Sequence, residues 1–215
     1  MHRAVQLFEL LPEGPAQLLP ADAMYVHIPG FDWWYVVMVI AYFIHYLLAI
    51  HLSPSHDTRA LTTGIYQIRS EAERLNERLE PTTTLVPDTG SNFLAQRFPS
   101  HIQDALRQMR MRYRTLQQLW PLERFRQSLE QQEVNEDRHC SPGEAPDLHA
   151  PFRQRHNESR PHWGLVFESG GDPLTSEEAY RQAIPIHLPA WQGWAKITRE
   201  KIGVIPVVGD ECKAV

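Results

Sequence analysis

Five residues within one polar stretch have the side-chain types that bind zinc. Zinc takes three or four nitrogen or sulfur ligands in tetrahedral geometry. The spacings of these residues match no recurring zinc pattern, and the chain has 11 histidines, so clustering by chance is easy. We therefore predict neither a metal site nor a cofactor. The five residues are His139, Cys140, His149, His156 and His162.

Motifs for phosphate binding and for nucleophilic catalysis do not occur in the sequence. Gly170-Gly171-Asp172 reads as a turn, because neither GxGxxG nor GxxxxGK[ST] is present. GxSxG and HExxH do not occur either. With no nucleophile–base pair or metal constellation in view, we expect no catalytic residue, no small-molecule substrate and no enzymatic activity.

The charge balance argues against nucleic acid as a partner. The chain has 21 Lys and Arg against 26 Asp and Glu, which gives a net charge of −5. Phosphate binding favours a basic surface. We therefore expect protein or lipid partners and no nucleic acid.

One uninterrupted apolar block runs from Trp33 to Leu52 and contains no Asp, Glu, Lys or Arg. As a helix, a segment of this length would span about 30 Å, the hydrocarbon thickness of a bilayer. The sequence therefore predicts one transmembrane helix over 33–52. Arg59 and Arg69 follow the block, whereas the twenty residues before it have no Lys or Arg, which places the C-terminal side in the cytosol, matrix or stroma.

Four residues of this predicted helix fall on one face: Val37, Ala41, His45 and Ala49, at steps of four. Small residues around a polar one are typical of a helix–helix contact, because they allow close approach. We expect this face to pack on other membrane helices. An ionisable group inside a membrane is also a candidate for function, so a redox or proton-handling role of His45 stays open.

A helix is predicted from Arg59 to Glu80, where apolar residues repeat in a heptad-like spacing. Such a stripe must be buried, either within its own domain or against a partner subunit, and both alternatives stay open. The candidate partner-binding residues of this stripe are Leu61, Ile65, Ile68, Leu75 and Leu79.

A second helix is predicted from Ser100, with a basic side that includes Arg107, Arg110 and Arg114. These arginines could contact an anionic membrane or an acidic partner, or could lie on a solvated face. Pro121 then either kinks the chain or opens a third helix, whose apolar side holds Leu122, Phe125 and Leu129.

The C-terminal part is rich in proline and reads as irregular from Glu133 to Pro173. A short helix from Thr175 to Ala183 follows, with Thr175 and Glu178 as its capping pair. The tail contains Trp191 and Trp194 and suits a groove on another protein, so both tryptophans are candidate partner-binding residues.

These features predict a mainly α chain: an N-terminal transmembrane helix, then extramembrane amphipathic helices, then a long irregular proline-rich arm. The boundaries are a short segment over 1–32, the membrane helix over 33–52, a helical region over 53–133 and the loop-rich arm over 134–215.

The functional hypothesis is a non-catalytic accessory subunit of a membrane complex, foremost a mitochondrial inner-membrane ATP synthase or respiratory-chain complex. The C-terminal part would lie in the matrix. Its partners would be the bilayer and the other membrane and soluble subunits. A membrane-tethered adaptor or assembly factor is the alternative, beside the redox role of His45.

Overall fold

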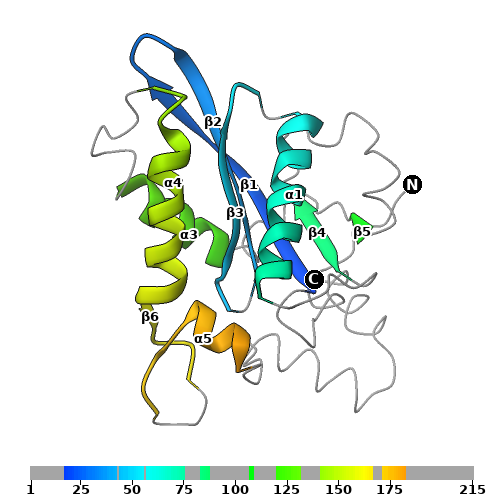
Figure 1. Cartoon of the computed structure of the whole chain (residues 1–215), viewed down its shortest axis with the longest axis vertical. Coiled ribbons are helices and arrows are strands. Elements are labelled where there is room, and N and C mark those ends of the chain that lie inside the picture. Colours follow the sequence, from blue (N-terminus) through cyan, green and yellow to red (C-terminus); the bar gives the residue numbers. More distant parts are fainter. Residues whose placement is uncertain are drawn as a thin grey trace, which may run out of the picture.

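The computed structural model describes residues 17–42, 44–55, 57–75, 83–87, 107–108, 120–131, 141–166 and 171–182. Its centre is a five-stranded sheet with the order β3-β2-β1-β4-β5. Helices pack against both faces of this sheet (Figure 1). The strands are β1 (Leu18–Ile28), β2 (Asp32–Ile40), β3 (Leu47–Ser53), β4 (Thr84–Pro87) and β5 (Arg107–Gln108).

The strands β1, β2 and β3 form an antiparallel meander. The turn between β1 and β2 places Gly30 (φ 82°) and Asp32 (φ 67°) in the left-handed region. Glycine has no Cβ to clash there, and aspartate tolerates the conformation better than most residues. The amide of Phe31 closes the turn with a hydrogen bond of 2.9 Å to the carbonyl of Ile28. Beyond β1, the strands β4 and β5 continue the sheet in parallel.

The predicted transmembrane helix is wrong, and with it the mainly α fold class. The segment from Trp33 to Leu52 forms most of β2, a turn and most of β3, paired in antiparallel register from Tyr35↔Ser53 to Ile40↔Leu47. His45 sits in that turn with φ 56°. Within the described residues, none of the helices combines the length and apolar character that a bilayer crossing requires.

The apolar block misleads because much of it is buried on both faces of a sheet. Val36 to Ile40 are all fully buried, as are Leu47 to Ala49. A strand covered on both sides reads as a continuous apolar run without alternation. Its valines, isoleucines and aromatic residues also favour strands, so composition and burial together explain the hairpin.

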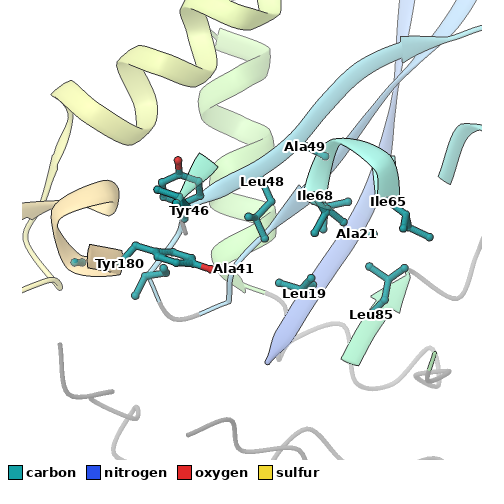
Figure 2. Close-up of a cluster of buried hydrophobic side chains, with 14 of the residues drawn as sticks. Leu19, Ala21, Ala41, Tyr46, Leu48, Ala49, Ile65, Ile68, Leu85 and Tyr180 are labelled. Atoms are coloured by element: carbon teal, nitrogen blue, oxygen red, sulfur yellow. The ribbon is translucent and has the colours of Figure 1, made fainter. Parts of the chain in front are cut away.

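Helix α1 (Thr58–Arg74) covers one face of the sheet and confirms the helix predicted from Arg59, although residues 76–80 lie outside the described part. The Asp57 side chain caps its first turn by accepting from the amides of Arg59 and Ala60. Ile65 and Ile68 pack with Leu19, Ala21 and other sheet residues in one apolar cluster (Figure 2).

Helices α3 (Trp120–Leu129) and α4 (Ala145–Gln154) contribute to the cluster on the other face. Helix α3 confirms that a third helix opens around Pro121, with Phe125 and Leu129 buried. The second predicted helix is contradicted where the structure describes it, because Arg107 and Gln108 form β5 and pair with Thr84 and Leu85.

The region from Glu133 to Pro173 is more ordered than its prolines predicted. It contains α4, a π-helical turn η5 (Arg155–Ser159) and the short strand β6 (Pro161–His162), which pairs with β7 (Leu174–Thr175). Pro146 lies in the first turn of α4, where a proline is tolerated because no helical amide is lost. Helix α5 (Ser176–Arg181) confirms the short capped helix, with Thr175 and Glu178 forming a capping box.

The side chain of Asn157 in η5 binds the start of β3, one of the two edge strands of the described sheet. Its side-chain oxygen accepts from the Leu47 amide at 2.8 Å, and its side-chain nitrogen donates to the Leu47 carbonyl at 3.0 Å. This side chain is buried and replaces the missing neighbouring strand at that residue. The contact therefore joins η5 to the sheet edge and satisfies backbone groups that would be costly to bury unpaired.

The buried carboxylate of Glu71 on α1 is the centre of a polar network that reaches α4, α5 and the residue before β3. Glu71 on α1 is 4% exposed and accepts a hydrogen bond of 2.6 Å from the Tyr46 hydroxyl. Arg74 lies 2.9 Å from the same carboxylate and also binds Glu177 on α5, while Arg153 on α4 approaches Glu71 at 3.5 Å. Burial, and then the neighbouring Glu71 carboxylate, raise the pKa of Tyr46, so its hydroxyl remains a donor.

Replacing Glu71 by Gln is expected to lower the free energy of unfolding by about 2 kcal/mol, because Arg74 and Arg153 lose the charge of the buried carboxylate that they contact. In a chain of this size that corresponds to a drop of roughly 4–8 °C in the thermal midpoint. Differential scanning calorimetry measures it. The matched control is Glu73→Gln, an exposed glutamate on the same helix. Equal midpoints for the two variants would contradict this role of Glu71.

Candidate functional site

Asp22 is a carboxylate in the middle of the central strand β1. The strand is otherwise apolar around it, from Leu18 to Ala21 and again at Met24. Asp22 is half-buried, and its Oδ1 accepts a hydrogen bond of 2.8 Å from the amide of Ala23. Because side chains alternate along a strand, Asp22 shares its face with Met24 and Val26, which belong to the cluster under α3 and α4.

The end of strand β4 lies beside Asp22. The pairing of β1 with β4 is parallel, and Pro87, the last residue of β4, is the partner of Ala21. The next residue in the sequence is Asp88, which is outside the described part of the chain. The register therefore places Pro87 beside Ala21, the residue before Asp22. The residue that follows Pro87 in the sequence is a second aspartate.

Helix α3 also packs beside β1. It contacts β1 directly, and Phe125 and Leu129 anchor it in the same cluster as Met24. Glu123 belongs to the first turns of this helix. Two further acidic residues are therefore associated with β1: Glu123 through the packing of α3, and Asp88 through its place in the sequence directly after β4.

A cleft of about 660 Å³ lies at the C-terminal half of α3. One wall comes from Gln127 and Ser128 of α3 and from Gln131, two residues beyond its end. The other wall comes from the turn around β6 with Arg160 and Trp163. His45, His156 and His162 also line it. Figure 1 shows β6 at the lower end of α4, where η5 ends.

The three histidines that line the cleft lie in contact with one another. The rings of His45 and His162 have centroids 5.6 Å apart, and those of His156 and His162 are 5.2 Å apart. His156 Nε2 is 2.9 Å from the carbonyl oxygen of His45. Burial lowers the pKa of His156 to about 3, and burial together with Arg160 lowers the pKa of His162. Both rings are therefore neutral at pH 7.

No group of three His, Cys, Asp or Glu side chains within the described ranges has the geometry to hold a metal ion. Of the five residues considered for zinc, the structure brings His156 and His162 together but places His149 on α4. His139 and Cys140 lie outside the described residues.

The four residues predicted to share one helix face lie on two strands and a turn. Val37 is in β2, Ala41 follows that strand, His45 is in the turn and Ala49 is in β3. Val37, Ala41 and Ala49 are fully buried inside the chain's own core. Their arrangement as a helical stripe is lost with the transmembrane helix.

The α1 stripe is buried within its own domain, which is the first of the two alternatives. Ile65, Ile68 and Leu75 are in the cluster between α1 and the sheet. The structure does not describe the side chains of Leu61 and Arg107. The remaining candidate partner-binding residues, all outside the described part of the chain, are Leu79, Arg110, Arg114, Trp191 and Trp194.

Asp22 was missed as a functional candidate because no local motif surrounds it. A usable signal existed, since it is a lone carboxylate within an apolar stretch that alternates from Met24 onwards. Asp88 and Glu123 were missed for a different reason: only the parallel pairing of β1 with β4 and the packing of α3 relate them to Asp22.

Comparisons with known proteins find similarity at the level of structure. No protein-family model matches the sequence, and no curated protein does. The chain is similar to the HTLV-2 integrase catalytic core domain in complex with magnesium, with 13% identity over 79% of this chain and 96% of that chain, and a TM-score of 0.51. The catalytic core domain of BIV integrase gives 14% identity, 78% and 95% coverage, and a TM-score of 0.52.

A third similar structure is the simian T-cell lymphotropic virus intasome in complex with the PP2A regulatory subunit B56 gamma. It gives 11% identity over 84% of this chain and 63% of that chain, with a TM-score of 0.55. At these identities the similarity establishes the fold alone. The fold is that of integrase catalytic cores, which is RNase H-like.

This similarity corrects the functional hypothesis. The structural neighbours are integrase catalytic cores and not subunits of ATP synthase or respiratory complexes. The accessory-subunit hypothesis is therefore wrong, and so is the placement in the mitochondrial inner membrane, which depended on the transmembrane helix. The tethered adaptor and the redox role of His45 depended on the same helix and are not retained.

Acid should destabilise the fold through His156. Its folded pKa, about 3, is below the unfolded value of 6.5, so the unfolded chain binds the extra proton and stability falls as pH drops below 6.5. This one group contributes a loss of up to about 1.4 kcal/mol per pH unit in that range. Urea unfolding of the wild type and His156→Gln at pH 7 and pH 5 tests it.

Between pH 7 and pH 5, the His156→Gln variant should lose less free energy of unfolding than the wild type, whatever its stability at pH 7. The control His27→Gln, at an exposed histidine of β1, should lose as much as the wild type. The assignment to His156 fails if His156→Gln and the wild type lose the same amount.

Proposed function

We propose that this chain is a magnesium-dependent phosphoryl-transfer domain that acts on nucleic acid, with Asp22 as a metal-binding carboxylate. The observation that carries the proposal is the position of Asp22, half-buried in the middle of the central strand of a sheet shared with integrase catalytic cores. The proposal departs from two sequence-based expectations that stay untested, namely the lack of enzymatic activity and of a nucleic-acid partner.

The chemistry of Asp22 fits magnesium. Mg²⁺ prefers oxygen ligands and is commonly held by one or two carboxylates together with substrate phosphates. A carboxylate has two oxygens with about four acceptor positions. In Asp22, Oδ1 accepts a hydrogen bond from the Ala23 amide. One of the similar structures, the HTLV-2 integrase core, is described in complex with magnesium.

Two further carboxylates are proposed as ligands from their positions in the chain. Asp88 follows Pro87, whose strand partner is Ala21, and Glu123 is on the helix that contacts β1. An acidic residue on a central strand, one that follows the neighbouring parallel strand in the sequence and one on a packed helix would together supply the negative charge that a cation site needs. Paired metal sites in nucleases and polymerases have this carboxylate chemistry.

The chain's own residues would position the reacting groups. Bound magnesium supplies charge stabilisation at a phosphoryl oxygen and activates an attacking hydroxyl or water. Asp22 would fix the position of the cation, because a residue in the centre of a packed sheet is held more rigidly than one on a loop. Its partial burial excludes some of the competing water and strengthens electrostatic interactions there.

The net charge of −5 does not decide against this function. It sums the whole chain, whereas phosphate contacts depend on local cations such as Arg160 in the cleft beside α3. Carboxylates gathered for metal binding also add negative charge that bound Mg²⁺ neutralises. Binding to nucleic acid should accordingly be stronger with divalent cations present.

Asp22→Asn is expected to lower the rate of Mg²⁺-dependent cleavage or joining of DNA by at least about 100-fold, because an amide oxygen binds the cation without compensating its charge. The assay uses a fluorescently labelled DNA duplex, with Mg²⁺ or Mn²⁺, and resolves products on a denaturing gel. Asp88→Asn and Glu123→Gln are expected to show losses of similar size.

The matched control is Asp32→Asn, at an exposed aspartate that begins β2 and adopts a left-handed conformation asparagine also tolerates. This variant should retain wild-type activity. A wild-type protein that neither cleaves nor joins DNA with either cation, or an Asp22→Asn variant with full activity, would contradict the proposed function.

A further inference from the structure

The cleft at the C-terminal half of α3 has walls of two different kinds. Gln127 on α3 and Gln131 just beyond its end provide amide groups, whereas Arg160 and Trp163 come from the turn around β6. Trp163 is 87% exposed, the highest exposure among the large hydrophobic residues of the described chain. An indole held open on the rim of a cleft contributes little to folding and is available to a ligand.

The polar groups of the cleft suit an anionic strand. Arg160 is exposed and offers a charged donor, and no carboxylate is among the described lining residues. The Nε2 atom of His162 is buried and has no hydrogen-bond partner within the described part of the chain. Buried polar atoms are nearly always satisfied, so an unsatisfied atom in a cleft wall points to a polar ligand.

The helix relates this cleft to the proposed catalytic residues. Gln127 follows Glu123 at a step of four on α3, and Gln131 lies four residues further on, two residues beyond the end of the helix. Gln131 lies eight residues after Glu123, a distance of about 12 Å at the α-helical rise. A DNA strand advances about 3.4 Å per nucleotide, so this distance corresponds to three or four nucleotides.

We propose that this cleft binds one strand of the nucleic-acid substrate three to four nucleotides from the scissile phosphate. Arg160 would contact a phosphate, and Trp163 would stack on a base. Stacking tolerates every base and suits a strand whose end is unpaired. The inference rests on the proposed function for its reference point, the scissile phosphate, but makes its own claim about binding.

A nucleic-acid strand fits the cleft better than a peptide. Trp163 is the one highly exposed aromatic residue of the described lining, which combines it with the amide side chains of Gln127 and Gln131 and the cation of Arg160. Peptide grooves are lined mainly by apolar pockets or pair an open strand edge, and β3, the outermost strand nearby, is closed at Leu47 by Asn157.

Fluorescence anisotropy of the full chain with a labelled DNA duplex carrying a single-stranded 3′ overhang tests the proposal. Binding is measured without divalent cations, so that the result does not depend on Asp22. Arg160→Ala combined with Trp163→Ala should raise the Kd about tenfold and reduce the slope of log affinity against log salt by about one. Gln131→Glu should also weaken binding, because it adds a negative charge to the wall.

The matched control combines Arg69→Ala with Trp33→Ala, an exposed arginine on α1 and a tryptophan that is 59% exposed on β2. It should bind like the wild type. The proposal is overturned if the cleft variants bind like the wild type, if the control weakens binding equally, or if the wild type does not bind. Loss of cleavage in Asp22→Asn with unchanged cleft-dependent binding would separate the two claims.

Discussion

The pairing of β1 with an antiparallel neighbour on one side and a parallel neighbour on the other is the constraint on which the rest of the structure depends. The register Ala21↔Val39 and Ala21↔Pro87 places the first half of β1 in the centre of the sheet. One face then receives α1 and the other receives α3 and α4. Asp22 is the carboxylate that this arrangement holds between β2 and the end of β4, on the side of α3.

Polar interactions outside the apolar clusters tie the surrounding elements to this sheet. Glu71 links α1 to Tyr46 and, through Arg74, to α5, while Asn157 closes the edge of β3. The Glu71–Tyr46 and Asn157–Leu47 hydrogen bonds are buried and join segments far apart in sequence. They explain how a proline-rich region can become ordered: η5 and α5 are positioned by specific side chains as well as by apolar burial.

The sequence predicted local structure well where the signal was local. The helix predicted from Arg59 carries an apolar stripe, and the helix predicted from Thr175 has a capping box with Glu178. A third helix at Pro121 was one of two alternatives, and α3 is that helix. It failed from Trp33 to Leu52, because a hairpin buried on both faces and a membrane helix share the same uncharged apolar composition. The candidate site was beyond reach, since Asp22, Asp88 and Glu123 are related only by strand pairing and helix packing. Hydropathy alone cannot report such long-range contacts.

The central claim is that Asp22 binds a divalent cation, and anomalous diffraction from crystals soaked in Mn²⁺ tests it most directly. The account predicts a strong anomalous peak about 2.1 Å from a carboxylate oxygen of Asp22. The same soak of Asp22→Asn crystals should lose that peak. Well-ordered crystals with Mn²⁺ bound elsewhere, and with no peak at Asp22, would contradict the claim.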